Sequence, residues 1–225
     1  APPRGSLEFD RDGEPIYGPK DDVDLAGFRK LGVDFWLAGG FGTKEKLKEA
    51  LDNGARGIQV GSAFAFCDES GFTTSIKQQV INQVLSEKLT VKTDMKASPT
   101  GFPFKVLNVT GTLHDETAYL KRKRVCDLGY LREAYEKADG NIGYRCPSEP
   151  VDDYVKKGGK VEDTIGRKCL CNGLVSAIGV AQLRNNEKEG SLITAGNDVV
   201  NIKKFIKENQ VTYSAKDVLD ELLCN

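Results

Sequence analysis

Apolar residues in the first third of the chain form two short runs separated by a helical pattern. The segment 35–66 contains the run FWLAGG, then KEKLKEALDNG, and then a second run, ARGIQVGSAFAF. In its middle part, Leu47, Ala50 and Leu51 follow the i, i+3, i+4 spacing of one helix face. Two short strands on either side of a helix are typical of a βαβ unit with a parallel sheet.

The ends of this helix are marked by residues suited to capping. Thr43 is a good N-cap residue, and Gly54 suits the left-handed position that follows a helix. In the second strand, Ile58 and Val60 point to one face and Gln59 to the other. If the branched pair packs under helices, Gln59 faces the interior of a barrel, near its mouth, and needs a polar partner there. That partner is either a cofactor ring or a polar group of a neighbouring strand.

Each strand of this unit ends in small residues, Gly39-Gly40 in the first and Gly61-Ser62 in the second. The carboxyl ends of parallel strands lie at the same edge of a sheet, where glycines let a backbone approach a ligand closely. In a (β/α)₈ barrel, a phosphate commonly binds at the loops after the last two strands. These four residues therefore predict a phosphate site, and turn or helix-packing glycines are the alternative.

The remaining pattern predicts further elements along the chain. We expect a hairpin at residues 7–17 with an Asp-Gly turn, and a second hairpin with Tyr135 on one strand and Ile142 and Tyr144 on the other. We expect further strands at 33–38 and 104–109, and a strand or loop at 192–195. Expected helices cover residues 24–31, 74–88, 115–123 and 173–183, a segment capped by Asn197 or Asp198, and a last segment with a capping box of Ser214 and Asp217.

Three further positions carry specific expectations. Trp36 lies in a predicted strand and is expected in the core. Residues 68–70 are expected to cap the following helix, and lining the mouth of a pocket is the alternative. His114, the single histidine, precedes a predicted helix and is expected to face solvent, so the sequence contains no Ser-His-Asp or Cys-His arrangement for a hydrolase.

Composition and charge narrow the class of protein. The 225 residues are 39% hydrophobic and 29% charged with a net charge of −1, which is typical of a soluble globular protein and does not favour binding to nucleic acid or to a membrane. No apolar run reaches the roughly 18 residues of a membrane span, and no signal peptide is visible. We expect a cytoplasmic protein. The single methionine is Met95, so we also expect a piece of a longer chain.

The composition changes from about residue 125 to 173, where turn residues and cysteines accumulate. Cys126, Cys146, Cys169 and Cys171 could hold a zinc ion or an iron–sulfur cluster. Their spacing contains no CxxC pair, so reduced and mostly buried thiols are favoured and no metal ligand is assigned. We expect residues 1–112 to form a barrel portion and residues 113–225 an irregular, helical extension packed on it.

Several segments together resemble one known family. They are APPRG, DFWLAGGFGTKEKLKEALDNGARGIQVGSAFAFCDESG, ASPTGFPFKV, RVCDLGYLREAY, GYRCPSEPVDDYV and GRKCLCNG. Nearly the whole chain resembles the nitronate monooxygenase family, also called 2-nitropropane dioxygenase-like flavoproteins. The last four segments resemble a subgroup with a cysteine-containing C-terminal extension.

The resemblance implies a (β/α)₈ barrel that binds FMN and oxidises alkyl nitronates with O₂. It implies that Gly39, Gly40, Gly61 and Ser62 hold the FMN phosphate and that Gln59 lies near the flavin. It also identifies the two strands as the seventh and eighth of the barrel, so the expected fold is the C-terminal portion of a barrel plus an α-rich extension.

The counterparts of the first six strands and the family's catalytic histidine have no match in this sequence, and the catalytic residue is unknown. Two alternatives stay open for function. One is an NAD(P)H-dependent FMN reductase of the enoyl-reductase type, and the other is a non-catalytic half-barrel. Because the first strand of the pair lacks its neighbour, a homodimer or a complementing N-terminal half-barrel is expected.

Overall fold

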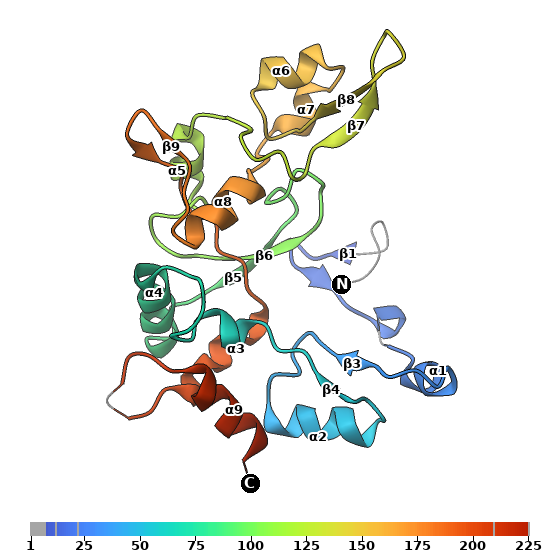
Figure 1. Ribbon diagram of the computed structural model, residues 1–225, viewed down its shortest axis with the longest axis vertical. Coiled ribbons are helices and arrows are strands. Elements are labelled where there is room, and N and C mark those ends of the chain that lie inside the picture. The colour runs from blue at the N-terminus through green and yellow to red at the C-terminus, as the bar shows by residue number, and fades with distance from the viewer. Residues whose placement is uncertain (1–7, 12, 22, 209, 225) are drawn as a thin grey trace. The chain divides into compact units, whose positions relative to one another are not determined.

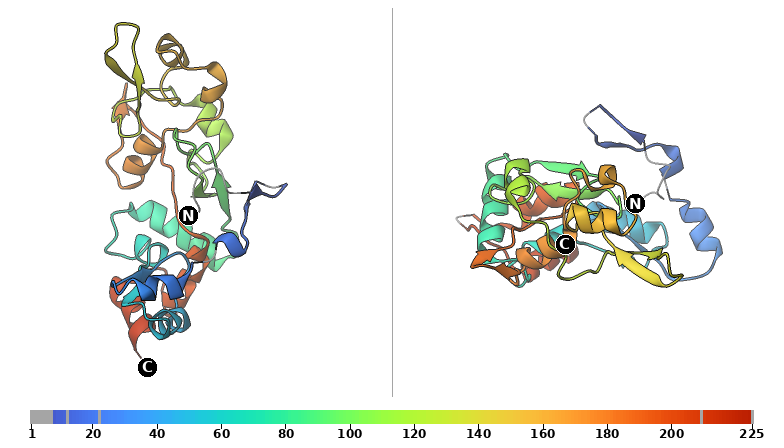
Figure 2. Two further views of the ribbon diagram at one scale, coloured as in Figure 1. Left: turned by 90° about the vertical axis from the view of Figure 1, so that its right-hand side faces the viewer. Right: turned by 90° about the horizontal axis from the view of Figure 1, so that it is seen from above.

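The computed structural model describes residues 8–11, 13–21, 23–208 and 210–224. The chain forms two compact units. Unit 1 comprises Ala1–Val91 and Ala195–Asn225, and unit 2 comprises Lys92–Thr194. Figure 1 labels the helices and strands, and Figure 2 shows them from two further sides. The predicted division after residue 112 falls inside unit 2 and stays a prediction.

The fold is α/β, and every sheet within the described residues has two strands, so these residues form no closed barrel. The first hairpin pairs β1 (Glu8–Phe9) with β2 (Pro15–Ile16) in antiparallel fashion, as predicted. A short 3₁₀ helix, η1 (Pro19–Asp21), and α1 (Leu25–Lys30) follow. Asp24 caps α1, because its Oδ1 accepts from the Gly27 N–H at 2.9 Å.

The predicted βαβ unit is present in unit 1, with strands shorter than expected. It consists of β3 (Trp36–Leu37), α2 (Lys44–Asp52) and β4 (Gly57–Ile58), and the two strands are parallel. Thr43 caps α2 and Gly54 follows it with φ 84°, as the sequence indicates. Leu37, Ala50 and Ala55 form the core of the βαβ unit, with Leu25, Phe35, Phe41 and Ile58 packed against it.

A second cluster of helices completes unit 1. It contains α3 (Ser62–Ala65), α4 (Thr74–Leu85), the 3₁₀ helix η2 (Asn197–Phe205) and α9 (Ala215–Leu223). Fully or nearly fully buried apolar side chains lie on α4, η2 and α9: Ile76, Val80, Ile81, Val84, Val199, Ile202, Phe205, Val218 and Leu222. Both α3 and α4 pack against η2, so the end of the chain returns to the segment that follows β4.

The caps of this cluster agree only in part with the sequence predictions. Ser214 and Asp217 form the expected capping box of α9. The helix α4 is capped by Thr73, and Glu69 instead accepts from the Ala215 N–H in the first turn of α9. The prediction of a cap by Asn197 or Asp198 is wrong, because η2 starts after Gly196 and Asp198 bonds to another loop.

Unit 2 is built from short elements joined by irregular segments. They are β5 (Val91–Asp94), β6 (Phe104–Leu107), α5 (Glu116–Lys121), β7 (Glu133–Glu136), β8 (Ile142–Arg145), α6 (Val151–Lys156), α7 (Val161–Thr164), α8 (Leu170–Ala177), β9 (Leu183–Arg184) and β10 (Glu187–Lys188). The predicted hairpin is confirmed in β7 and β8, and α6 and α7 lie in a stretch where the sequence indicated no helix. The predicted helix 173–183 begins earlier and ends at Ala177.

Two kinds of contact hold unit 2 together. A small apolar core contains Ala97, Val106, Leu113, Leu170 and Leu192. The guanidinium of Arg145 lies over the rings of Tyr135 and Tyr154, which connects the β7–β8 hairpin to α6. Across the described parts of both units, none of the helices combines the length and the apolar character that a membrane crossing requires.

Candidate functional site

The parallel pair in unit 1 sets the position of both glycine loops. Trp36 pairs with Gly57 and Leu37 with Ile58, and the ladder continues where the Gln59 N–H donates to the Leu37 carbonyl at 2.8 Å. Both strands therefore run in the same direction and end at the same edge. The structure thus brings the first glycine loop and the second to one end of the sheet, as the sequence predicts.

Gly39 and Gly40 form a loop that only glycine fits without strain. Their φ angles are 79° and 94°, and no heavy atom lies within 4 Å of a Cβ built on either residue. Within the described part of the chain, neither N–H donates to a protein acceptor. Exposed backbone donors beside open space are the feature that a phosphate-binding loop requires.

The second loop differs in its chemistry. Gly61 has ordinary backbone geometry and also leaves open space around a built Cβ. Ser62 is buried, and its hydroxyl donates to Asp198 Oδ1 at 2.7 Å and accepts from the Gly196 N–H at 3.0 Å. The Ser62 side chain therefore connects this loop to the start of η2, and its hydroxyl is committed to protein partners.

The face of the sheet that carries Gln59 is open. Gln59 is exposed, whereas Ile58 packs against the core under α2, so the predicted alternation is confirmed. The prediction that Trp36 lies in the core is wrong, because its side chain is 53% exposed and lies against Gly57. Trp36, Gly57 and Gln59 share this face, while only the opposite face is covered. Successive side chains of a strand point to opposite faces. The apolar Leu37 next to Trp36 was therefore the sequence signal that Trp36 lies on the other face.

The histidine and the four clustered cysteines lie outside these loops, in unit 2. His114 is half-buried rather than solvent-facing, and burial, with Lys168 next in size, lowers its pKa, so the ring is neutral at pH 7. Within the described residues, no three side chains of His, Cys, Asp or Glu are grouped so that they could hold a metal ion.

Among the four cysteines, only Cys126 has a lowered pKa, and the Cys146 thiol hydrogen bond is its largest cause. Burial is the main cause that raises the pKa of both Cys169 and Cys171. The cysteines of unit 2 are therefore a direct pair, Cys126 and Cys146, with two further thiols that stay protonated at neutral pH.

Comparison with protein families gives one result. The family model of nitronate monooxygenase matches residues 35–211, which begin at β3 and include both glycine loops and the whole of unit 2. No curated protein and no solved structure matches the chain significantly.

Proposed function

Because this chain belongs to the nitronate monooxygenase family of oxidoreductases, we propose that it supplies the phosphate-binding part of an FMN site in an enzyme that oxidises alkyl nitronates with O₂. The observation that carries this proposal is the pair of glycine loops at one edge of a parallel sheet. FMN, when bound, supplies the redox chemistry, and the protein supplies binding and orientation.

The residues present fit a phosphate group. The N–H groups of Gly39 and Gly40 are unpaired in the described part of the chain, and the space beside both residues is open. Gly61 offers open space at the second loop. Since the Ser62 hydroxyl is engaged by Asp198, we assign to Ser62 a backbone contact rather than a hydroxyl contact.

The open face of the sheet is the proposed place of the flavin ring. Gln59 is exposed there and its side chain forms no hydrogen bond with the described residues, and Trp36 lies on the same face. A polar amide beside a large aromatic surface suits a ring with both apolar area and hydrogen-bonding edges. The side chains of Gln59 and Trp36 would orient the ring, and this chain's catalytic residue stays unassigned.

The proposal includes pairing with further strands. Among the described residues, β3 and β4 pair only with each other, so each strand has an open outer edge. An eight-stranded barrel closes only when every strand has two neighbours. We assign the missing neighbours to a second copy or to a complementing half-barrel. Light scattering of the purified chain should give at least twice the mass of one chain, and a stable monomer would contradict pairing with a second copy.

The test of the FMN site uses two glycines that both leave open space for a side chain. Gly61→Leu places a side chain in the open space of the second loop without a positive-φ penalty, and Gly18→Leu does the same at a distant open position. We expect the Kd for FMN, measured by flavin fluorescence, to rise about 10- to 100-fold in Gly61→Leu, or about 1.4–2.8 kcal/mol. Gly18→Leu should bind FMN like the unmodified protein, and equal affinity in both variants would refute the phosphate assignment.

The reaction is tested separately with the assembled, flavin-loaded protein. Under anaerobic conditions, a nitronate should bleach the flavin absorbance, and NADPH should leave it unchanged. Rapid bleaching by NADPH alone would replace the nitronate proposal by a reductase of the enoyl-reductase type. Because binding and reduction are measured independently, the cofactor assignment can stand even if the substrate assignment fails.

A further inference from the structure

The segment around Cys126 in unit 2 has no regular secondary structure, yet polar contacts fix it on both sides. Before Cys126, an Nη2 donor of Arg122 bonds to the Val125 carbonyl at 3.4 Å. After it, Arg184 forms an ion pair with Asp127. The carbonyl of Cys126 itself accepts from Arg132 at 3.1 Å. The backbone that carries this thiol is therefore held in place by three arginines.

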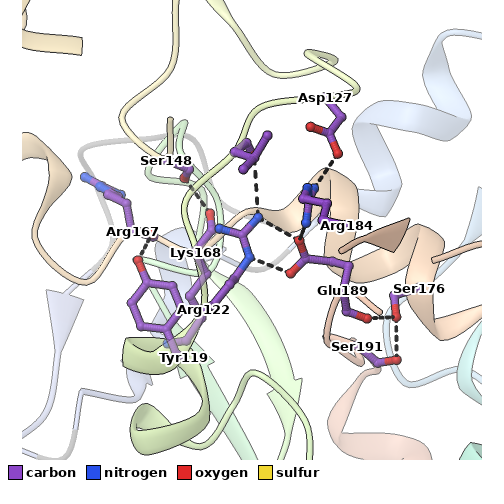
Figure 3. A network of polar contacts seen from close by, with 11 residues as sticks. Tyr119, Arg122, Asp127, Ser148, Arg167, Lys168, Ser176, Arg184, Glu189 and Ser191 are labelled. Atoms are coloured by element: carbon purple, nitrogen blue, oxygen red, sulfur yellow. Dashed lines mark hydrogen bonds and ion pairs between the residues drawn. The ribbon is translucent and has the colours of Figure 1, made fainter. Parts of the chain in front are cut away.

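Two of these arginines are anchored to one buried carboxylate. Figure 3 shows Arg122 and Arg184 converging on Glu189, with Asp127 beyond Arg184. The side chain of Glu189 is 0% exposed and that of Arg122 is 6% exposed. Burial alone would raise the pKa of Glu189, but the hydrogen bonds from both guanidinium groups lower it overall. Removing one partner of such a buried pair is costly, so both arginines depend on the Glu189 carboxylate.

A fourth arginine joins this segment to the one that carries Cys146. Arg124 donates to the Pro147 carbonyl at 3.1 Å and also to the Thr164 carbonyl. The Cys146 N–H donates to Glu149 Oε1 at 3.3 Å, which closes a tight turn after β8. Arg124 thus bonds to the residue beside Cys146 from a position two residues before Cys126. This contact links the segment that carries Cys126 to the turn that carries Cys146.

The two thiols are not equivalent. Interaction with the Cys146 thiol, aided by the Arg132 guanidinium, lowers the pKa of Cys126 to about 6. The same interaction, followed by burial, raises the pKa of Cys146. Cys126 is partly exposed and Cys146 is buried, so Cys126 is the more accessible residue of the two. A reachable thiolate beside a protected thiol is the arrangement of redox-reactive cysteine pairs.

The other charged and titratable groups around Cys126 are few. The carboxylate of Glu149 opposes the thiolate, but it is paired with Lys157 at 2.8 Å. Cys169 and Cys171 contribute thiols whose pKa values are raised, mainly by burial. Arg132 is therefore the main cation beside the Cys126 sulfur, and its own pKa is raised by the contact.

We propose that Cys126 is a site of oxidation by peroxides and that Cys146 is the thiol that resolves it into a disulfide. The Cys126 sulfur attacks one peroxide oxygen, the O–O bond breaks, and the other oxygen leaves as an alkoxide or hydroxide that takes up a proton. The sulfur of Cys146 then attacks the sulfenic acid of Cys126. The S–S bond forms, the S–O bond breaks, and the hydroxyl leaves as water with the proton of Cys146.

Overall, two thiols and one peroxide give one disulfide, one alcohol or water, and one further water, so the peroxide is the oxidant throughout. This inference is independent of the proposed FMN site. It places a modification in unit 2 that neither the family match nor the glycine loops imply.

The test treats the full chain with one equivalent of hydrogen peroxide and maps the products by mass spectrometry. We expect a single disulfide that joins Cys126 to Cys146. Cys146→Ser should stop at the sulfenic acid of Cys126, which dimedone traps, and Cys126→Ser should form no disulfide. Circular dichroism melts of both variants check that each is folded. Cys224→Ser, at an exposed cysteine of unit 1, is the control and should behave like the unmodified chain.

A second measurement tests the thiolate without any oxidant. At pH 6, about half of Cys126 should be thiolate, and after allowance for its lower intrinsic nucleophilicity it should react with iodoacetamide about 10-fold faster than Cys224. Equal alkylation rates, a first disulfide to Cys169 or Cys171, or stoichiometric zinc bound by the cysteines of the purified chain would each overturn the proposal.

Discussion

The two units of this protein build their candidate sites from different parts of the chain. In unit 1, the proposed phosphate site consists of backbone N–H groups in glycine loops, and side chains contribute little. In unit 2, the reactive segment is irregular and is fixed by side chains, above all by Arg122 and Arg184 on the buried Glu189. A backbone site tolerates changes to nearby side chains, whereas a side-chain network fails when one member is lost.

The largest effect is expected from Glu189 in unit 2. Glu189→Gln removes the charge that compensates Arg122 and Arg184, and breaking such a buried pair costs about 3–5 kcal/mol. The control is Glu133→Gln, since Glu133 pairs with Arg145 at 2.8 Å but is 49% exposed, and exposed pairs contribute about 0–1 kcal/mol. The free energies of unfolding of the two variants in urea should differ by several kcal/mol. A similar loss of stability in both would show that the buried network stabilises the protein no more than an exposed ion pair does.

The contribution of Glu189 and its two arginines to the free energy of unfolding depends on pH. The pKa of Glu189 is lower in the folded protein than in the unfolded chain. Its stabilising contribution is therefore complete above the ordinary carboxyl pKa of roughly 4.3 and is lost as the pH falls through the lower, folded value. The difference in stability between the unmodified chain and Glu189→Gln should shrink as the solution is acidified below about pH 4.

An intermediate effect is expected at the glycine loops of unit 1. Gly40→Ala introduces a Cβ at φ 94°, which costs about 1–2 kcal/mol for an L-residue. Gly61→Ala introduces the same methyl group into equally open space at φ −100°, so it should be neutral or slightly stabilising. Urea unfolding of both variants makes the comparison. If Gly61→Ala destabilises as much as Gly40→Ala, the backbone conformation is not what requires glycine in the first loop.

The sequence predicts those features that depend on residues close together in the chain, and it misses those that depend on residues far apart. Thr43 and Gly54 act on residues within one or two turns, so the bounds of α2 could be predicted. The bond between Ser62 and Asp198 spans 136 residues, and the pair of Arg122 and Glu189 spans 67. No local pattern encodes contacts of that separation, so neither was predicted. The sequence identified Cys126 and Cys146 as two of four candidate thiols. Their proximity could not be predicted, because it depends on Arg124, whose partners also lie far along the chain.

The smallest effect on stability is expected at Trp36, which corrects the sequence prediction most directly. It is the single tryptophan of the chain and is 53% exposed on the open face of the β3–β4 sheet. Trp36→Phe should change the free energy of unfolding by less than about 1 kcal/mol, because little apolar area leaves the protein interior. Acrylamide should quench the Trp36 fluorescence readily in the absence of FMN. Since Trp36 shares its face with Gln59, added FMN should quench the fluorescence and protect it from acrylamide. A tryptophan that acrylamide cannot reach in the flavin-free protein would mean that this face is already covered, and the flavin ring would then need another place.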